Sequence, residues 1–460
     1  MKTLAAVFKN KEIMSRIFFT LMCLFIFRLG ANIIVPGAQP TDRLTEAINT
    51  TNTIGLLNMI GGGALQTFSI FALGVSPYIT AQIIIQLLSM DVLPALTELT
   101  KQGEHGRKKI DMATRYLTLM LGAVQAYAMI TLMKQNDYVV LSGDDFWTYA
   151  YIIVVMLGGT MFAMWLGDQI TEKGIGNGIS MIIFSGIVVN IPKQIQTAFT
   201  KWILQNMGLT EAGNELFVGL AQFVLYIIMF LVIILFVVFI EMSKRKIPVQ
   251  HSSKSGGQNT KMSSTSFLPI KLNSSGVLPV IFASSILTAP VIVASFFGET
   301  GGSTIEGVFN WTHIFDPNGR TFLGSAGFWM PFGAIIYVTL IILFSFFYAQ
   351  IQINPEKMAE NFQKNGSYIP GIRPGNETER YVRKVVNRVT CMGAIALAII
   401  ALIPVIISLT QLFGPESSAL ALGGTGLIIV VGVSMELKSQ VEGLLAGKSF
   451  EEASSAGRGF

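Results

Sequence analysis

The stretch that decides the fold runs Gly61-Gly-Gly-Ala-Leu-Gln-Thr-Phe-Ser-Ile-Phe-Ala-Leu-Gly74-Val-Ser-Pro77-Tyr-Ile-Thr-Ala-Gln-Ile-Ile-Ile-Gln-Leu-Leu88. It is apolar enough for a membrane, but three successive glycines disfavour a helix, and Gly74 and Pro77 interrupt any helix that follows. Irregular backbone at membrane depth is tolerated only where protein buries it or where it borders a water-filled cavity. We therefore expect a short loose helix, a break and a firm half-helix beside a pore.

The composition of the whole chain is that of a polytopic membrane protein. The 460 residues are 51% hydrophobic and 13% charged, with a mean hydropathy of +0.58, whereas soluble domains average roughly 25% charged residues. Ten windows reach or approach the ~20 apolar residues that cross ~30 Å of hydrocarbon. They are Ile17–Val35, Ser69–Met90, Tyr116–Met133, Tyr149–Leu166, Ile179–Gln196, Phe217–Ile240, Gly276–Phe297, Phe328–Ile351, Val389–Leu412 and Ala419–Leu437.

The distribution of Lys and Arg predicts the orientation, because cytoplasmic loops carry the excess of these residues. With the N-terminus inside, the inner segments hold 26 of the 32 Lys and Arg residues and the outer segments hold 5. Both termini are therefore expected in the cytoplasm. The first window is longer than a signal-peptide core and carries Arg28 near its middle, so we expect a retained span. A charge there is costly, so Arg28 should face the bundle interior and bond carbonyl groups.

A short internal repeat divides the chain into two halves. Gly74-Val-Ser-Pro77 opens the firm part of the second span, and Gly276-Val-Leu-Pro279 opens the seventh. Five spans per half is an odd number, so the halves, residues 1–200 and 201–460, must cross the membrane in opposite senses. Matching Gly and Pro breaks in inverted halves point to a site at their interface. The predicted fold is an all-α membrane protein of ten spans in two inverted five-helix halves.

The residues after Pro77 have two distinct helix faces. Ile79 and Ile83 stand four apart and share one face, while Gln82 and Gln86 share another. One face can line a pore and the other can meet a neighbouring helix. Taken alone, however, an isoleucine pair in a membrane helix is more often ordinary packing.

Two inner loops, residues 242–273 and 354–388, are long and basic. The second has helix signals from Pro355 to Gln363 and again from Glu377 to Arg388, with a Gly- and Pro-rich turn between. Basic loops set the topology of membrane proteins, and loops of this length can also dock a cytosolic body or RNA phosphates.

The sequence offers no catalytic or metal-binding motif. The three histidines, His105, His251 and His313, form no zinc-protease pattern, and Cys23 and Cys391 fall inside spans. Gly443-Leu-Leu-Ala-Gly-Lys-Ser449 is one residue too short for a phosphate-binding loop. We expect no enzyme activity, no cofactor and no metal. A small-solute transporter is the main rival, because it too uses inverted repeats, but it needs convergent polar groups at mid-membrane. An intramembrane enzyme would need a catalytic pair.

Over nearly its whole length the chain resembles the SecY family of bacterial protein-conducting channels. The matching stretches are Phe27-Arg-Leu-Gly30, Val35-Pro-Gly37, Gly61-Gly-Gly-Ala-Leu65, Ser69-Ile-Phe-Ala-Leu-Gly74, Pro77-Tyr-Ile-Thr80, Met164-Trp-Leu-Gly-Asp-Gln-Ile170, Gly174-Ile-Gly-Asn-Gly-Ile-Ser180, Gly276-Val-Leu-Pro279, Ile281-Phe-Ala283, Asn354-Pro-Glu-Lys-Met-Ala359, Tyr368-Ile-Pro-Gly-Ile-Arg-Pro-Gly375 and Gly423-Gly-Thr425.

This resemblance implies a clamshell of two halves around a constriction. The pore ring would draw on Ile79 and Ile83, on Ile183 or Ile187, on Leu278 and Ile281, and on Ile429. The plug would lie within residues 61–71 and include Gly61, Gly62, Gly63, Ala64, Leu65 and Phe68. The second and seventh spans would form a lateral gate, with Gln82, Gln86, Ser284 and Thr288.

The resemblance also implies the function and the partners. The expected function is passage of unfolded secretory polypeptides across the bacterial plasma membrane and sideways release of hydrophobic segments into lipid. The small subunits SecE and SecG, the motor ATPase SecA, ribosomal RNA phosphates, signal peptides, nascent chains and lipids would be its partners. Docking of the motor or ribosome would use Arg373, Lys357, Lys364, Lys244, Arg245 and Lys246.

Overall fold

Long helices make up most of the chain in the computed structural model of the protein. The structure describes residues 10–50, 58, 61–89, 93–143, 145–204, 213–251, 266–295, 321–323, 328–330, 332–410 and 418–456. Seven helices in these ranges are long and apolar enough to cross a membrane, and α5 (Ser76–Leu88) is a shorter apolar helix.

A helix lies within or across each of the ten apolar windows of the sequence. In chain order they are α2 (Lys11–Gly30), α5, α7 (Glu104–Gln135), α8 (Phe146–Lys173), α9 (Gly178–Phe199), α11 (Gly213–Met242), α12 (Leu278–Ser295), α14 (Phe332–Gln352), α16 (Asn376–Thr410) and α17 (Ser418–Ala456). Shorter helices are α3 (Asp42–Thr50), α6 (Pro94–Lys101) and α15 (Pro355–Lys364), and a π-helical turn, η1 (Thr200–Leu204), follows α9.

Local signals explain where several helices begin. The side chain of Asn177 accepts hydrogen bonds from the backbone N–H groups at the start of α9, and Asn354 does the same for α15. Pro77 stands in the first turn of α5, where its missing N–H has no intrahelical partner to lose. A tight turn around Gly176 connects α8, which ends at Lys173, to α9, which begins at Gly178.

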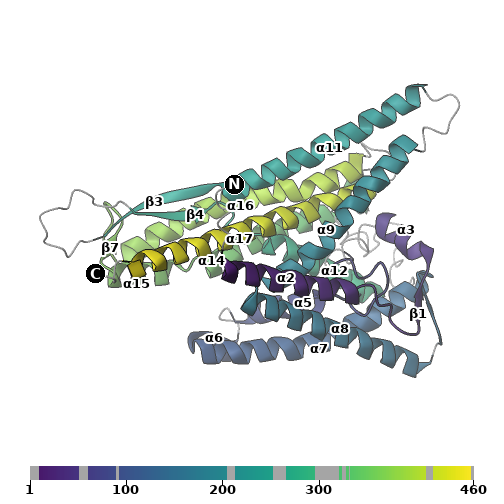
Figure 1. Ribbon diagram of the computed structural model, residues 1–460, viewed down its shortest axis with the longest axis horizontal. Helices are drawn as coiled ribbons and strands as arrows, with labels where there is room; N and C mark the ends of the chain where they lie inside the picture. The colour runs from purple at the N-terminus through teal and green to yellow at the C-terminus, as the bar shows by residue number, and fades with distance from the viewer. Residues whose placement is uncertain are drawn as a thin grey trace, which may run out of the picture.

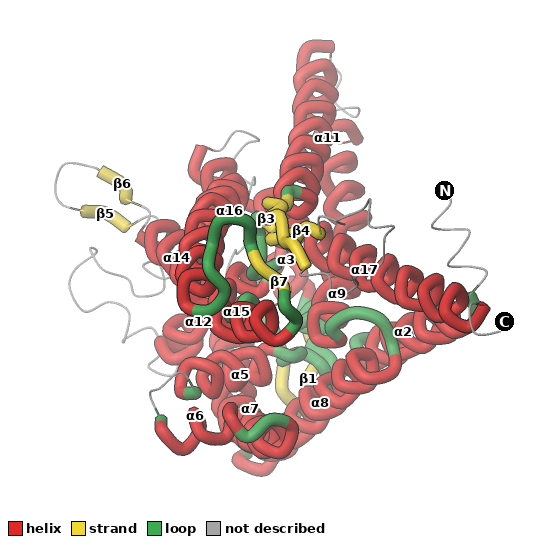
Figure 2. Tube along the Cα trace, turned by 90° about the vertical axis from the view of Figure 1, so that its left-hand side faces the viewer, coloured by secondary structure: helices red, strands yellow, loops and turns green. Residues whose placement is uncertain are grey.

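The helices pack in two groups that follow the order of the chain. Helices α5, α7, α8 and α9 contact one another in sequence, with α2 against α8 and α9. In the second group α14 packs on α12 and α16, and α17 packs on α11 and α16. Figure 2 shows α5, α6, α7 and α8 on one side of the molecule and α11, α14 and α16 on the other. The groups meet where α12 contacts α5 and α7 and where α17 contacts α9.

Residues 61–75 are irregular at the centre of this bundle. The predicted short loose helix is wrong, because the segment consists of turns and a single β-bridge between Ile34 and Ser69. Gly62, Gly63 and Gly74 have φ angles of 72°, 80° and 55°, which side chains rarely adopt. The break before a firm half-helix was predicted correctly, since α5 begins at Ser76.

The two long basic loops contribute strands to a small sheet, so the all-α prediction needs a correction. β3 (Lys244–His251) pairs antiparallel with β4 (Ser266–Lys271) and, at its far end, with β7 (Ser367–Tyr368). The order β4-β3-β7 therefore joins the two loops, and buried Ile247, Ile270 and Val386 connect this sheet to α16. Two further two-stranded sheets are β1 (Ala38–Pro40) with β2 (Val139–Leu141) and β5 (Thr321–Leu323) with β6 (Phe328–Met330).

The ends of the bundle carry different elements. The β3–β4 hairpin, β7, α15 and the C-terminal end of α17 lie at one end of the long axis, on the left of Figure 1. The β1 strand lies at the opposite end. The basic residues on β3 and α15 are thus found away from β1.

We predict that two neighbouring glycines of α8 respond oppositely to substitution. A Cβ atom on Gly159 would lie 1.9 Å from the carbonyl oxygen of Ile70, whereas Gly158 has nothing within 4 Å of that position. Gly159→Ala should lower the free energy of unfolding by about 1–3 kcal/mol through overpacking. Gly158→Ala should leave it unchanged or raise it by up to about 1 kcal/mol. Unfolding in detergent measures both, and equal stability of the two variants would contradict this packing.

Candidate functional site

The residues expected to form the ring come together in one apolar cluster. Ile79 and Ile83 of α5, Ile183 and Ile187 of α9, Ile281 of α12 and Ile429 of α17 are all buried in it, and Leu278 packs against it half-buried. Ile183 and Ile187, the two alternatives expected on α9, both lie in the cluster, and the role of each stays a prediction. Two of these helices belong to the first group of helices and two to the second.

The chemistry of this cluster suits a seal that opens. β-branched isoleucine side chains are stiff about the first torsion, and apolar constrictions exclude water and ions. Such a surface holds no specific ligand, in contrast to the convergent polar groups that a small-solute site needs. The described residues also contain no group of three or more His, Cys, Asp or Glu side chains placed to hold a metal.

The segment at residues 61–71 packs directly against the cluster. Ala64 and Phe71 are members of it, and Leu65 and Phe68 are buried in a neighbouring apolar cluster. Gly62 leaves no room beside α9, since a Cβ atom on Gly186 would lie 2.2 Å from the Gly62 carbonyl carbon. This close contact places the segment within one turn of Ile183 and Ile187 on α9.

A few side-chain hydrogen bonds hold the segment in place. The Arg28 guanidinium donates to the carbonyl oxygen of Gly62 at 3.2 Å, which confirms the prediction that Arg28 bonds backbone carbonyls. The Thr67 hydroxyl donates to the carbonyl oxygen of Ala31 at 2.7 Å. Lys193 of α9 donates to the side-chain oxygen of Gln66 at 3.3 Å. None of these three hydrogen bonds lies within a helix, so breaking them does not unfold a helix.

The contact between α5 and α12 is the seam where the second and seventh spans meet. The Ser284 hydroxyl is used within α12, donating to the Ile281 carbonyl oxygen at 2.8 Å. Gln82 is half-buried, and the side chain of Thr288 lies outside the described residues. Gln86 accepts a hydrogen bond from the Tyr348 hydroxyl of α14. The polar contact across the seam thus comes from α14, and sequence reasoning missed Tyr348, whose only signal was a tyrosine within an apolar span.

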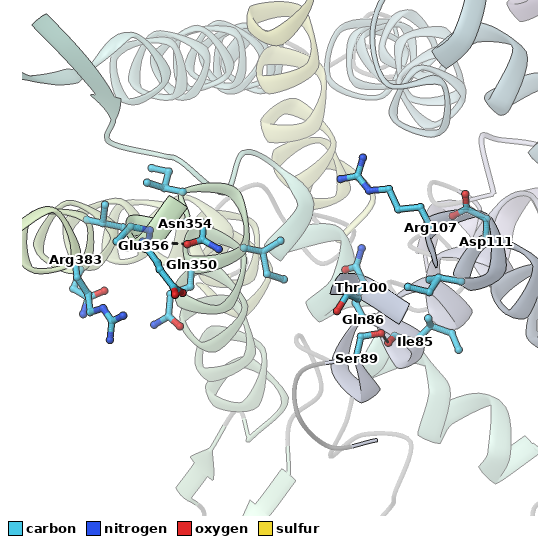
Figure 3. A pocket seen from close by; sticks show the side chains of 16 residues that line it. Ile85, Gln86, Ser89, Thr100, Arg107, Asp111, Gln350, Asn354, Glu356 and Arg383 are labelled. Carbon is cyan, nitrogen blue, oxygen red and sulfur yellow. Dashed lines mark hydrogen bonds between the residues drawn. The ribbon is translucent and has the colours of Figure 1, made fainter. Parts of the chain in front are cut away.

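A cleft of about 890 Å³ opens beside the C-terminal end of α5. Figure 3 shows its lining side chains in two groups, with Gln86, Ser89, Thr100, Arg107 and Asp111 on one side and Gln350, Asn354, Glu356 and Arg383 on the other. The first group comes from α5, α6 and α7 and the second from the α14–α16 region. The cleft therefore separates the two groups of helices.

The six basic residues expected to dock a partner lie on the sheet-bearing end of the molecule. Lys244, Arg245 and Lys246 are exposed on β3, Lys357 and Lys364 are exposed on α15, and Arg373 is exposed in the turn before α16. Lys364 forms an ion pair with Glu360 at 3.5 Å. The β3–β7 pairing joins the segments that carry these residues.

A family model described as SecY matches residues 69–438. The chain belongs to the SecY family. The protein translocase subunit SecY of Mycoplasma capricolum subsp. capricolum is 42% identical over 452 residues, covering 96% of this chain and 89% of the relative.

Solved structures share the fold at lower identity. A SecY protein studied for its plug domain, which stabilises the closed state of its channel, matches with a TM-score of 0.66 and 18% identity over 94% of this chain and 92% of the other. Sec61 in a canine ribosome–channel complex matches with a TM-score of 0.61 at 18% identity, with the same two coverages of 94% and 92%. This SecY-family chain is accordingly a multi-pass membrane protein with the fold of a protein-conducting channel.

Proposed function

We propose that the chain is the central pore-forming subunit of a protein translocation channel. Unfolded secretory polypeptides would pass through the ring of Ile79, Ile83, Ile183, Ile187, Leu278, Ile281 and Ile429. The observation that carries this proposal is that these residues, from four helices in two groups, belong to or pack against the main apolar core of the bundle, where α5 meets α12 and α9 meets α17. A translocating chain has no fixed sequence, so an apolar, deformable ring suits it better than a pocket shaped for one ligand.

The topology in this proposal is two inverted five-helix halves, residues 1–200 and 201–460, with both termini in the cytoplasm of a bacterium. Its support is the excess of Lys and Arg on the proposed inner side. The sheet β4-β3-β7, α15 and the end of α17 lie together at one end of the bundle, as this topology requires (Figure 1).

The segment formed by residues 61–71 would act as the plug below the ring in the resting state. An arriving polypeptide would displace it by exchanging the hydrogen bonds of Arg28, Thr67 and Lys193 for others. The stabilising plug described for the related SecY structure is consistent with this role.

The seam between α5 and α12 would open sideways to lipid and sort segments by partition. Twenty Leu-like residues gain about 6–12 kcal/mol in the bilayer, while each central charge costs about 3 kcal/mol. Two or three charges therefore offset most of that gain. A gate of this kind separates membrane spans from secreted segments without recognising a sequence, and the cleft at its inner end would admit the signal segment.

The basic end of the molecule would dock the cytosolic partners. Arg373 and the lysines of α15 and β3 present cations that suit ribosomal RNA phosphates or acidic surfaces of the motor SecA. The apolar outer faces of the spans would meet lipid and the small subunits SecE and SecG. The ribosome-bound state of the related Sec61 structure is in keeping with docking at this end.

The direct test places a photo-reactive amino acid at Ile83 and stalls a secretory chain during translocation. We expect the chain to crosslink to this position because Ile83 lies in the proposed ring. The control is the same probe at Phe25, which is 62% exposed on α2 and should face lipid. Crosslinking at neither position, or equally at both, would contradict the proposed pore.

The gate makes a second prediction. Tyr348→Phe removes the hydrogen bond to Gln86, and one such bond is worth about 0.5–1.5 kcal/mol. The open gate should therefore be populated roughly two- to tenfold more, and export of chains with weakened signal segments should rise accordingly.

Tyr337→Phe is the matched control for this gate variant. Tyr337 lies on the same helix and is buried, and its hydroxyl has no hydrogen-bond partner within the described chain. Export that rises equally in both variants would show that the bond to Gln86 does not hold the gate.

A further inference from the structure

A second cavity lies on the inner side of the ring. Its volume is about 380 Å³ and its lining includes Ser180 of α9, Leu278 of α12 and Gly432 of α17. Leu278 is itself a ring member, and Ser180 and Gly432 each stand three positions from a ring member on their own helix, Ile183 and Ile429, on the inner side. The cavity, here named the antechamber, therefore lies directly above the constriction.

The antechamber carries more negative than positive charge. Its lining holds two carboxylates, Glu241 at the end of α11 and Glu436 of α17, and one cation, Lys271 of β4. Asn273 fixes the first carboxylate by donating to Glu241 Oε1 at 2.5 Å. Glu436 is exposed and has no hydrogen-bond partner among the described residues, so its carboxylate is available to a ligand.

A serine that lines the same cavity also has a side chain without a hydrogen-bond partner among the described residues. Ser180 is only 4% exposed and lines the antechamber, and within the described chain its side chain makes no hydrogen bond. Asn177 caps the helix here by accepting from the Ser180 backbone N–H, so the Ser180 hydroxyl has no part in the cap. This side chain lines the same cavity as the two carboxylates, so a donor ligand bound there can reach all three groups.

We propose that the antechamber binds the cationic side chain, an ammonium or guanidinium, of a Lys or Arg residue of the polypeptide in transit. The inference rests on the proposed function. It specifies which side-chain group of the translocating polypeptide binds in the antechamber. The apolar ring offers a cation no compensating charge, whereas the carboxylates of Glu436 and Glu241 do. The Ser180 oxygen can in addition accept a hydrogen bond from the cation. A segment with Lys or Arg is thereby held on the inner side before it enters the ring.

The experiment compares two stalled secretory chains that differ by one residue. One chain carries Lys and the other Gln at the position that reaches the antechamber, and a photo-reactive amino acid replaces Ser439, which lines the cavity. The Lys chain should crosslink roughly two- to fivefold more than the Gln chain, the factor expected for a partly exposed ion pair. High salt should reduce this ratio by screening.

Charge variants decide whether the antechamber causes the difference in crosslinking between the Lys chain and the Gln chain. Glu436→Gln and Glu241→Gln should bring the ratio of the two chains toward one, and Lys271→Gln should raise it. Glu442→Gln is the matched control, because Glu442 lies on α17 outside the cavity and is 4.0 Å from Lys438. A ratio near one in the unmodified protein, or one that the first three substitutions leave unchanged, would overturn the proposal.

The same experiment separates this inference from the proposed function. If neither chain crosslinks at Ser439 or at Ile83, the polypeptide does not reach the ring and both proposals fail. If both chains crosslink equally, the pore stands and only the cation site fails. Because Lys271→Gln must move the ratio upward, a folding defect in the glutamate variants cannot mimic the full pattern.

Discussion

The whole arrangement depends on satisfying the irregular backbone of residues 61–75 inside an apolar bundle. An unpaired buried backbone group costs about 1–3 kcal/mol, and this segment has no helix to pair its groups. The Val35 N–H donates to the Phe68 carbonyl oxygen at 3.1 Å, and the Ile70 N–H donates to that of Ile33 at 3.0 Å. The Arg28 guanidinium donates a hydrogen bond to the carbonyl oxygen of Gly62. The segment can therefore remain non-helical at the centre of the molecule.

Close backbone contacts complete that arrangement. Gly186 of α9 and Gly159 of α8 lie so near the segment that a Cβ atom on either would collide with its backbone. The fit is tight, yet it consists of van der Waals contacts and a small number of hydrogen bonds. These contacts fit the proposed plug role, because an element held in this way could be displaced more easily than a continuous helix packed along its full length.

Much of this could be predicted from the sequence because the signals are local. Glycine and proline act on their own backbone, so the break before Ser76 and the turn at Gly176 follow from the residues themselves. A single arginine in an apolar window needs acceptors nearby, and Arg28 finds one. The same reasoning overestimated the order of residues 61–71, where a loose helix was expected, because three glycines next to tightly packed neighbours favour turns.

Long-range pairings could not be predicted in the same way. Tyr348 and Gln86 are 262 positions apart, and neither residue's own sequence neighbourhood indicates the other. The strand β3 looked like a basic loop, because its pairing with β4 and β7 depends on partners that periodicity does not reveal. The assignment of individual residues to ring, plug, gate and docking roles came from family resemblance, and those roles remain proposals, although the ring residues all lie in or against the main apolar core.

The most direct test of the central claim is the ion conductance of the idle channel in a planar bilayer. Replacing Ile79 and Ile83 together with serine should open a measurable leak, because polar side chains would let water and ions into the constriction. The matched replacement of Ile335 and Ile399, which are 46% and 51% exposed on α14 and α16, should not. An idle channel that stays as tight with the first pair replaced as with the second would contradict the apolar seal.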